Sequence, residues 1–526
     1  SRLRQHGAEV TTPAEMAMIQ APVEGLNWRE PPTGLKPTEA LHLENVLPRP
    51  SSGELRAGYE EHCVGLPAPV KTLAPYIGLN QDQNRLFAFC EQGGIFDVTE
   101  KAKDPTASES TSQTDGVWSY INFSGVDKNF LCAVSPEGGY WTFNPEDGWA
   151  QETLTGDATD KKFSGIFQWK DRVWLIEQNS TRAYYLGVAA ITGEATLFDF
   201  HGVMRHGGYL LWGTNWTFDA GYDLSDYFVL ATSNGDIIVY EGINPSEAST
   251  FTLKGVWNVG RLPCYGRSLT HFGGELFFMS NLGVVPMSAL VNGKVANEYQ
   301  VASAKIQPVL NTVFDEWCAT FGWEMHMVYQ HAFVLLKTPE KADGTHVYYV
   351  MNVQTGAWGQ ITQMPMLTAG LHNDEFYFGT SDGRVCKAFV GHEDDVQFDG
   401  TEGAPIIGHY LGGYSDFGKP GAYKVFQMAR PFFNATSAPS VNVKVATGYD
   451  FAFPTIEGEY AADDNLGRFD VSNWNECLWA GSQNTYSAWE GLSGIGYFGA
   501  FMVSYTGPKH AQFLNSTLTF QVGGAM

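Results

Sequence analysis

The chain has 526 residues, of which 44% are hydrophobic and 14% aromatic, so it can form a large core in about two to four domains. Only 17% of the residues are charged, yet the formal net charge is −25, and residues 71–400 alone contain 38 acidic and 20 basic side chains. This balance argues against a protein that binds nucleic acid tightly through basic patches. It is compatible with a surface past which nucleic acid slides, or with a charge that serves solubility alone.

The first twenty residues, SRLRQHGAEVTTPAEMAMIQ, lack the apolar segment of a signal peptide, and the chain has no run of 18 apolar residues. We therefore expect a protein that is made and folded in a reducing cytoplasm, with no stable membrane insertion. Residues 12–15, Thr-Pro-Ala-Glu, match a capping box with Thr12 as the N-cap, which predicts a short helix over 13–20.

A long segment rich in proline and glycine follows. Residues 45–62 alone contain two prolines, two glycines and a Ser-Ser pair among scattered charges. Because such a sequence offers no periodic apolar face, we expect residues 1–70 to form a short helix and an irregular, extended arm without a core of its own.

A hairpin pattern recurs through the middle of the chain, with two aromatic and aliphatic strands joined by a turn of Gly, Asn, Asp or Ser. The seven copies begin at Asn84, Asn129, Asp171, Asp226, Gly274, His331 and Asp374. Their starts are 42 to 57 residues apart, and about four strands in such an interval is typical of a propeller blade. The sequence therefore predicts an all-β fold with a β-propeller of six or seven blades over 71–400, and a β-sandwich array is the competing architecture.

One segment within this region has helical periodicity instead. In SAKIQPVLNTVFDEWC (303–318), apolar residues recur at the spacing of one helix face. We predict an amphipathic helix inserted in the propeller, with Ser303 as its N-cap.

The last part of the chain, 401–526, alternates in the manner of antiparallel strands, as in APSVNVKV (438–445) and STLTFQV (516–522). We predict a separate C-terminal antiparallel β-sandwich. Three tryptophans, Trp474, Trp479 and Trp489, lie between these strands and either form core or bind glycans by stacking.

The sequence contains no pattern of catalytic residues, and we expect no enzyme, no cofactor and no metal site. GIGYFG (494–499) has the letters of a dinucleotide motif, but an aromatic strand follows where that motif needs a helix. The seven cysteines include no C-x-x-C pair, so we expect neither a disulfide framework nor a zinc site. The acidic run His392–Asp395 is compatible with a cation, and a solvated turn is the more ordinary interpretation.

The segment 21–62 resembles the start of the tail nozzle proteins of short-tailed phages (podoviruses), also called tail tubular protein B, and of the related packaged-DNA stabilisation proteins. The resemblance consists of a glycine-containing turn, an Asn shortly before a Pro, and a run with Gly, Leu, Arg and Gly that leads into a propeller. The matching residues are Gly25, Asn27, Asn45, Pro48, Gly53, Leu55, Arg56 and Gly58. Glu24 replaces the first glycine of the pair that usually forms the turn.

The resemblance implies a structural protein of the virion tail rather than an enzyme. It implies a homo-oligomer, a ring-shaped hexamer at the distal tail end, that docks on the tail adaptor protein, retains packaged viral DNA and conducts it at ejection. Tail fibres or spikes are further implied neighbours. The arm would then strap neighbouring subunits or domains together, and the alternative is a segment that closes the propeller within one chain.

The acidic middle of the chain suits such a conduit. DNA has one negative charge per ~1.7 Å of duplex, so a wall of Lys and Arg would hold it, whereas an acidic or neutral wall lets it pass. A channel wall concentrated in Lys and Arg would contradict this hypothesis. The rival function is a glycan-binding propeller that recognises a host surface, which would present exposed aromatic side chains in concave pockets.

Overall fold

The computed structural model describes residues 13–110, 115–219, 224–293, 301–401, 403–449, 452–456, 466–467, 478–479, 484–508 and 510–523. The chain forms two compact units. The propeller unit comprises Gly58–Val353 and Ile361–Ala404, and the sandwich unit comprises Ser1–Ala57, Gln354–Gln360 and Pro405–Met526.

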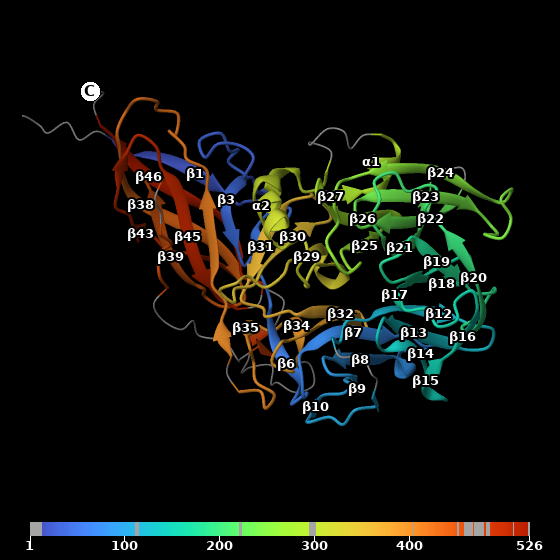
Figure 1. Cartoon of the computed structure of the whole chain (residues 1–526). Helices are drawn as coiled ribbons and strands as arrows, with labels where there is room; N and C mark the ends of the chain where they lie inside the picture. The colour runs from blue at the N-terminus through green and yellow to red at the C-terminus, as the bar shows by residue number, and fades with distance from the viewer. Residues whose placement is uncertain are drawn as a thin grey trace, which may run out of the picture. The chain divides into compact units, whose positions relative to one another are not determined.

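Six sheets lie wholly within the propeller unit and form six blades around a common centre (Figure 1). From inner to outer strand, the first blade is β7 (Val70–Tyr76), β8 (Arg85–Cys90), β9 (Gly94–Asp97) and β11 (Glu109–Ser110), and the second is β12 (Ser119–Ser124), β13 (Asn129–Ser135), β14 (Gly139–Asn144) and β15 (Gly148–Glu152). The third is β17 (Phe163–Trp169), β18 (Arg172–Glu177), β19 (Arg182–Tyr185) and β20 (Gly193–Asp199), extended by β16 (Leu154–Gly156), and the fourth is β21 (Leu210–Asp219), β22 (Leu224–Thr232), β23 (Asp236–Gly242) and β24 (Phe251–Asn258). The fifth is β25 (Leu269–Phe272), β26 (Glu275–Ser280) and β27 (Gly283–Pro286), followed by the short helix α1 (Met287–Val291), and the sixth is β32 (Thr368–His372), β33 (Glu375–Gly379), β34 (Val385–Val390) and β6 (Gly58–Val64), extended by β10 (Ala102–Lys103).

Three strands of a nine-stranded sheet, β28 (Glu324–Val328), β29 (Phe333–Lys337) and β30 (Val347–Asn352), fill the sector between β25 and β32. Six whole sheets and this group of three strands therefore surround the centre, and the prediction of six or seven blades is confirmed. Strands in the middle of a blade are buried without alternation, as in β8, where Leu86 to Cys90 are all buried. This pattern arises because a neighbouring blade covers each face of the sheet.

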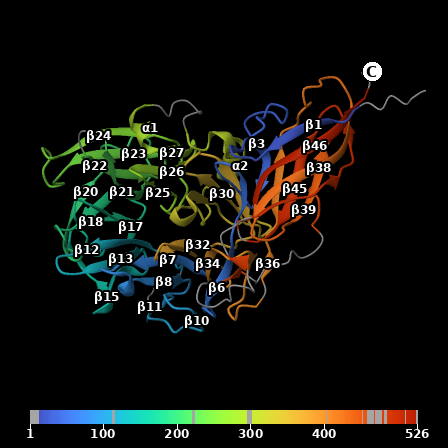
Figure 2. The ribbon, with the colours of Figure 1, turned by 180° about the vertical axis from the view of Figure 1, so that it is seen from behind.

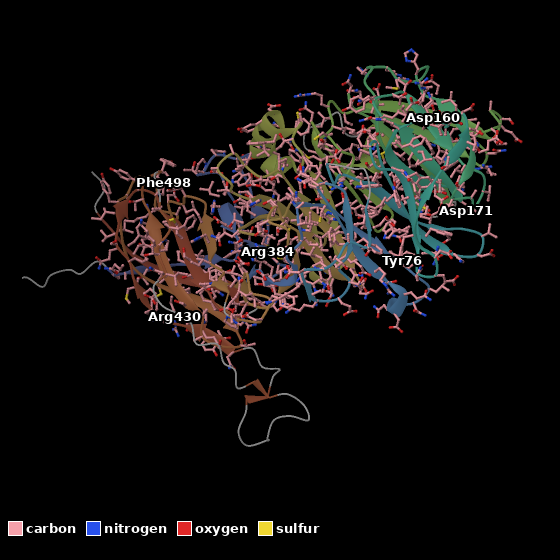
Figure 3. The ribbon with its side chains drawn as sticks, turned by 60° about the horizontal axis from the view of Figure 1, so that its bottom comes forward. Tyr76, Asp160, Asp171, Arg384, Arg430 and Phe498 are labelled. Carbon is pink, nitrogen blue, oxygen red and sulfur yellow. The ribbon has the colours of Figure 1, made fainter. Side chains whose placement is uncertain are left out.

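The ring of blades is closed by two segments that are far apart in the sequence. Strand β6 pairs antiparallel with β34, so the first strand of the propeller unit completes its last blade (Figure 2). Arg384, labelled in Figure 3, donates to Glu61 Oε1 of β6 at 3.1 Å and to Asp395 Oδ1 at 2.7 Å. Closure therefore combines backbone pairing with a partly buried ion cluster.

A buried carboxylate organises the blade of β21 to β24. Asp236 is fully buried, and Asp236 Oδ2 accepts from the backbone N–H groups of Arg205 and His206 at 2.7 and 2.8 Å. Asp236 Oδ1 interacts with His206 Nδ1 at 2.7 Å and accepts from Asn258 Nδ2 at 3.1 Å. Burial by itself raises the pKa of Asp236, but hydrogen bonds from Asn258, His206 and Arg205 outweigh it and hold the pKa below its ordinary 3.8.

We expect Asp236→Asn to lower the free energy of unfolding by about 2–3 kcal/mol at neutral pH, because an amide N–H₂ would face donors that now meet a carboxylate. The lowered pKa stabilises the fold above 3.8, and this contribution is lost as the pH falls below that value. Urea unfolding across the acid range should therefore show a shallower loss of stability in the variant than in the wild type.

The matched control is Asp171→Asn. Asp171 is exposed in the turn between β17 and β18 (Figure 3), with a φ of +54° that asparagine also tolerates. Its unfolding free energy should stay within about 0.5 kcal/mol of the wild type. Equal losses in the two variants would contradict the role assigned to Asp236.

The predicted helix is present as α2 (Gln307–Trp317), preceded by one turn of 3₁₀ helix, Ala304–Ile306. Ile306, Leu310 and Phe314 are buried, as the periodicity predicted. The prediction that the Ser303 side chain caps the helix is wrong, because its hydroxyl forms no capping hydrogen bond with the first turn. The Ser303 hydroxyl accepts from the backbone of Val284 at 2.9 Å and donates to Gln307 Oε1 at 2.8 Å, because the 3₁₀ turn shifts the start of the α-helix.

The core of the sandwich unit is formed by two sheets that face each other. One contains β46 (Gln512–Val522) and β38 (Lys424–Ala435), with β1 (Glu15–Gln20), β4 (Val46–Pro48), β5 (Gly53–Leu55), β42 (Asn484–Ser487), β43 (Glu490–Gly491) and β44 (Ile495–Gly496). The other contains β37 (Gly408–Gly412), β45 (Ala500–Thr506) and β39 (Ser440–Ala446), with β2 (Gly25–Leu26) and β3 (Glu39–Glu44). Phe433 of β38 lies 4.8 Å from Tyr505 of β45 between ring centroids, so aromatic side chains of both sheets form the core.

Two expectations for the N-terminal segment are wrong. Residues 15–20 form the strand β1 rather than a helix, because six consecutive residues pair with β46, which satisfies their backbone groups. Thr12 lies outside the described residues. The arm is also not irregular throughout: β2 to β5 pair with C-terminal strands and with each other, as the blue strands beside the red ones show in Figure 1. The propeller unit begins at Gly58 and ends at Ala404, where the sequence suggested 71–400.

Candidate functional site

The motif residues of the arm are brought together around Asn45 and Arg56. Both side chains are about 1% exposed, and Arg56 Nε donates to Asn45 Oδ1 at 2.8 Å. Asn45 Nδ2 donates to the carbonyl of Ile407 at 3.2 Å, and its φ of +57° lies in the left-handed region that asparagine tolerates. The backbone N–H of Arg56 donates to the Asn45 carbonyl at 3.0 Å. The pair therefore fixes the β4–β5 hairpin within the sandwich unit.

The other motif residues have backbone roles. Gly25, with a φ of +68°, passes so close to Trp358 that an added Cβ would lie 2.4 Å from its carbonyl oxygen. Asn27 Oδ1 accepts from the backbone of Arg29 and Glu30, which forms a turn. Pro48 pairs with Gly53 across the β4–β5 hairpin.

Leu55 is buried in the same hairpin, and Gly58 starts the closing strand β6 of the propeller unit. Buried side chains are not available to a second copy of the chain. These residues therefore have a folding role, and the assembly role of the arm stays a prediction.

Arg56→Met should lower the free energy of unfolding by about 2–4 kcal/mol, because Asn45 Oδ1 and the Ala57 carbonyl lose a buried charged donor. Urea unfolding followed by tryptophan fluorescence measures the loss. The control is Arg29→Met, because about a third of the Arg29 side chain is exposed, so that solvent screens its contact with Glu30 at 3.5 Å, and it should cost less than about 0.5 kcal/mol. Similar losses would show that the Arg56–Asn45 bond is not what stabilises the hairpin.

The propeller unit encloses a central cavity of about 810 Å³. Its walls come from the inner strands β7, β12, β17, β21, β25, β28 and β32 and from the loops that lead into them. This volume falls in the ~300–1,000 Å³ range of small-molecule pockets.

A buried ionic cluster lies in the wall of this cavity. Glu324 is 4% exposed and Lys337 is 1% exposed, and Lys337 Nζ lies 3.8 Å from Glu324 Oε2. Glu324 Oε1 accepts from the Thr368 hydroxyl at 3.2 Å and lies 3.5 Å from His326 Nε2 and 4.0 Å from Arg267. Burial by itself raises the pKa of Glu324, but His326, Lys337 and Arg267 lower it by more. The pKa of this carboxyl therefore lies below its ordinary value, and the group is held ionised.

Arg267 connects several inner strands at this point. Its guanidinium donates to the carbonyl of Lys71 at 2.7 Å, to the hydroxyl of Thr72 at 2.6 Å and to the carbonyl of Trp118 at 2.9 Å. It also lies over the ring of Phe321, 5.4 Å from the centroid. The only Lys or Arg side chain on the described part of the wall is therefore occupied by structural bonds.

Tyr265 at the cavity has a strained backbone. Its φ is +58°, a conformation that is rare for a bulky residue and costs on the order of 1–3 kcal/mol. The tyrosine is nevertheless 46% exposed, so burial of its ring does not fully offset the energetic cost of this conformation. Strained residues of this kind occur preferentially at functional sites.

The candidate sites predicted from the sequence include neither the ionic cluster nor Tyr265. A weak signal exists, because Glu324 and Lys337 flank the apolar hairpin β28–β29 in the sequence and pair with each other at its open end. The sequence alone does not show that this end is buried, and Arg267 comes from a different blade. Left-handed backbone at a tyrosine has no sequence signal.

Three further expectations concern single sites. Trp489 is 43% exposed and lies under the guanidinium of Arg430 at 5.9 Å, so it is not a core residue, whereas Trp474 and the side chain of Trp479 lie outside the described residues. In the acidic run, Glu393–Asp394 forms the strand β35, and Asp395 pairs with Arg384. Within the described part of the chain, no group of three His, Cys, Asp or Glu residues is arranged as a metal site.

Comparisons with known proteins identify no family for this chain. No family model matches the chain, and no curated protein matches it. Among solved structures it is similar to the WD40 beta propeller domain of Doa1, with 11% identity over 63% of this chain and 96% of that chain, at a TM-score of 0.38. U3-55K has 10% identity over 62% of this chain and 97% of that chain, at a TM-score of 0.39. None of the helices within the described ranges is long and apolar enough to span a lipid bilayer.

Proposed function

We propose that this protein is a structural component of a phage tail, a ring-shaped nozzle that docks on the tail adaptor, retains packaged DNA and conducts it at ejection. The supporting observation is the motif of residues 25–58, which resembles the start of nozzle proteins and leads at Gly58 directly into the closing strand of a propeller. In this role the protein is located in the virion tail and performs no bond chemistry.

The propeller cavity is not itself the DNA channel of the proposed ring. The cavity, at about 810 Å³, has the size of a small-molecule pocket rather than of a duplex channel. Under the proposal, DNA therefore passes between copies of the chain and not through one propeller.

The exposed edge strand β1 offers a surface for assembly of such a ring. Among the described residues β1 pairs with β46 alone, and Met16 and Met18 are 70% and 69% exposed on it. An edge strand with large exposed apolar side chains favours association with another chain. A ring requires such a head-to-tail contact, repeated from copy to copy until it closes.

The test is native mass spectrometry with negative-stain electron microscopy of the purified chain, with and without tail adaptor complexes. We expect a hollow ring, alone or seated on the adaptor, and fewer rings for Met16→Ser/Met18→Ser. The control is Leu79→Ser, which removes an exposed leucine from the propeller unit and should assemble as the wild type does. A monomer that ignores the adaptor would contradict the nozzle function.

A second candidate is a glycan-binding propeller that recognises a host surface. The observation in its favour is the central cavity, which has exposed tyrosines at its edge. A glycan array with the full chain separates the two functions, since a nozzle without a glycan role would bind none of the sugars.

A further inference from the structure

We propose that the central cavity of the propeller unit binds a neutral mono- or disaccharide beside Tyr209 and Tyr265. This inference deepens the second candidate function by locating its site and naming its ligand class. It does not depend on ring assembly: a monomer that ignores the adaptor would contradict the nozzle, and sugar binding by that monomer would still support this inference.

Two tyrosines stand at the edge of the cavity. Tyr209 immediately precedes the inner strand β21, Tyr265 lies shortly before the inner strand β25, and they are 38% and 46% exposed. Burial, Cys264, Asp115 and then Tyr209 raise the pKa of Tyr265, in that order of size, so the two phenols lie within electrostatic reach of each other. Exposed aromatic rings at a concave site provide the flat apolar surface on which a sugar ring lies, with hydroxyl groups for its edges.

The position of Tyr265 is fixed before any ligand arrives. The backbone N–H of Cys264 donates to the Cys318 carbonyl at 3.0 Å, and the Tyr265 ring meets Phe321 edge to face at 5.4 Å. Gly266 lies so close to β21 that an added Cβ would be 2.9 Å from both the Leu211 carbonyl oxygen and Trp212 Cβ. The strained backbone is thus held from both sides, which limits the loss of conformational entropy on binding.

The walls offer unused polar side chains. Within the described residues, the side chains of four exposed wall residues make no hydrogen bond; these are Ser164, Gln168, Gln178 and Asn179. Ser119 Oγ accepts from the backbone of Ile166 at 3.1 Å, which leaves its O–H free to donate. Hydroxyl and amide groups both donate and accept, as the hydroxyls of a sugar require.

The same wall disfavours other ligand classes. Arg267 is the only Lys or Arg among its described residues, and its N–H groups already bond to Lys71, Thr72 and Trp118, so these residues offer a phosphate or carboxylate no available Lys or Arg. A purely apolar ligand would bury the unused amides and hydroxyls without partners, which is costly. A polyhydroxylated neutral ligand matches both the rings and the amides.

The experiment uses the full chain and a panel of glucose, galactose, mannose, N-acetylglucosamine and their disaccharides. Saturation-transfer NMR identifies binders, and calorimetry measures their affinity. We expect at least one of these sugars to bind in the micromolar to millimolar range, and Tyr265→Gly to weaken it about tenfold or more. Glycine adopts the left-handed conformation without strain, so this variant removes the ring while the fold stays stable in urea unfolding.

Two controls make the result specific. Tyr265→Phe keeps the ring and should keep most of the affinity, and Tyr329→Ala removes a tyrosine that is 59% exposed elsewhere in the unit and should change nothing. Tetramethylammonium serves as a probe for a cation site between aromatic rings. The inference is overturned if no sugar of the panel binds, if Tyr265→Gly binds as the wild type does, or if only tetramethylammonium binds.

Discussion

Glu324→Gln is expected to lower the free energy of unfolding by about 3–5 kcal/mol, since removing one partner leaves Lys337 as an uncompensated buried charge. Lys337 is 1% exposed, and besides Glu324 its Nζ has a hydrogen bond to the Gly322 carbonyl at 2.6 Å. The double variant Glu324→Gln/Lys337→Met removes both charges, and replacing a buried pair by neutral groups is often nearly neutral. We therefore expect it to recover most of the loss in urea unfolding.

The pH dependence gives an independent measurement on the same pair. Burial, opposed by Glu324, lowers the pKa of Lys337 from 10.5 to about 8. Between these values the unfolded chain binds more protons at this residue than the folded chain, so this group makes unfolding free energy rise with pH. Lys337→Met should lack that rise. Identical pH profiles for Lys337→Met and the wild type, or no recovery in the double variant, would contradict this account of the cluster.

Gly58→Ala should open the propeller at its closing strand and cost about 3 kcal/mol or more. A Cβ on Gly58 would lie 1.8 Å from the carbonyl oxygen of Glu393, a backbone atom that a rotamer change cannot move. The clash would displace the start of β6 from β34 and weaken the contact of Glu61 with Arg384. Urea unfolding measures the cost, and hydrogen exchange at β6 and β34 reports local opening.

Gly202→Ala is the matched control for this substitution. Gly202 also lies in the propeller unit, but an added Cβ would meet nothing within 4 Å. Its free energy of unfolding should change by less than about 0.5 kcal/mol. If Gly58→Ala were equally mild, the close approach of β6 to Glu393 would not be important for closure.

The propeller could be predicted because its evidence is local. Each hairpin, such as the one beginning at Asn84, contains its own apolar runs and its own turn, and a blade is formed by strands that are neighbours in sequence. The helix over 303–318 was predictable for the same reason, since its apolar face is visible within one segment.

The N-terminal arm could not be predicted in this way. Several strands of residues 15–57 have partners far along the chain, as when β1 pairs with β46 and β3 with β37. A two- or three-residue strand such as β5 has no periodicity to detect, and only its partner makes it a strand. The motif residues were identified by resemblance, but their burial around Asn45 and Arg56 was not foreseen.

The sequence by itself determined the fold class, the repeated hairpins and the acidic charge, because these depend on composition and on residues close together in the chain. Tertiary structure alone decided which strand closes the ring, that Arg267 joins Glu324 and Lys337 in one buried cluster, and that Tyr265 is held in a left-handed conformation beside a cavity. The physical reason is that burial, register and strain at these places are imposed by segments from other blades, and no local pattern records them.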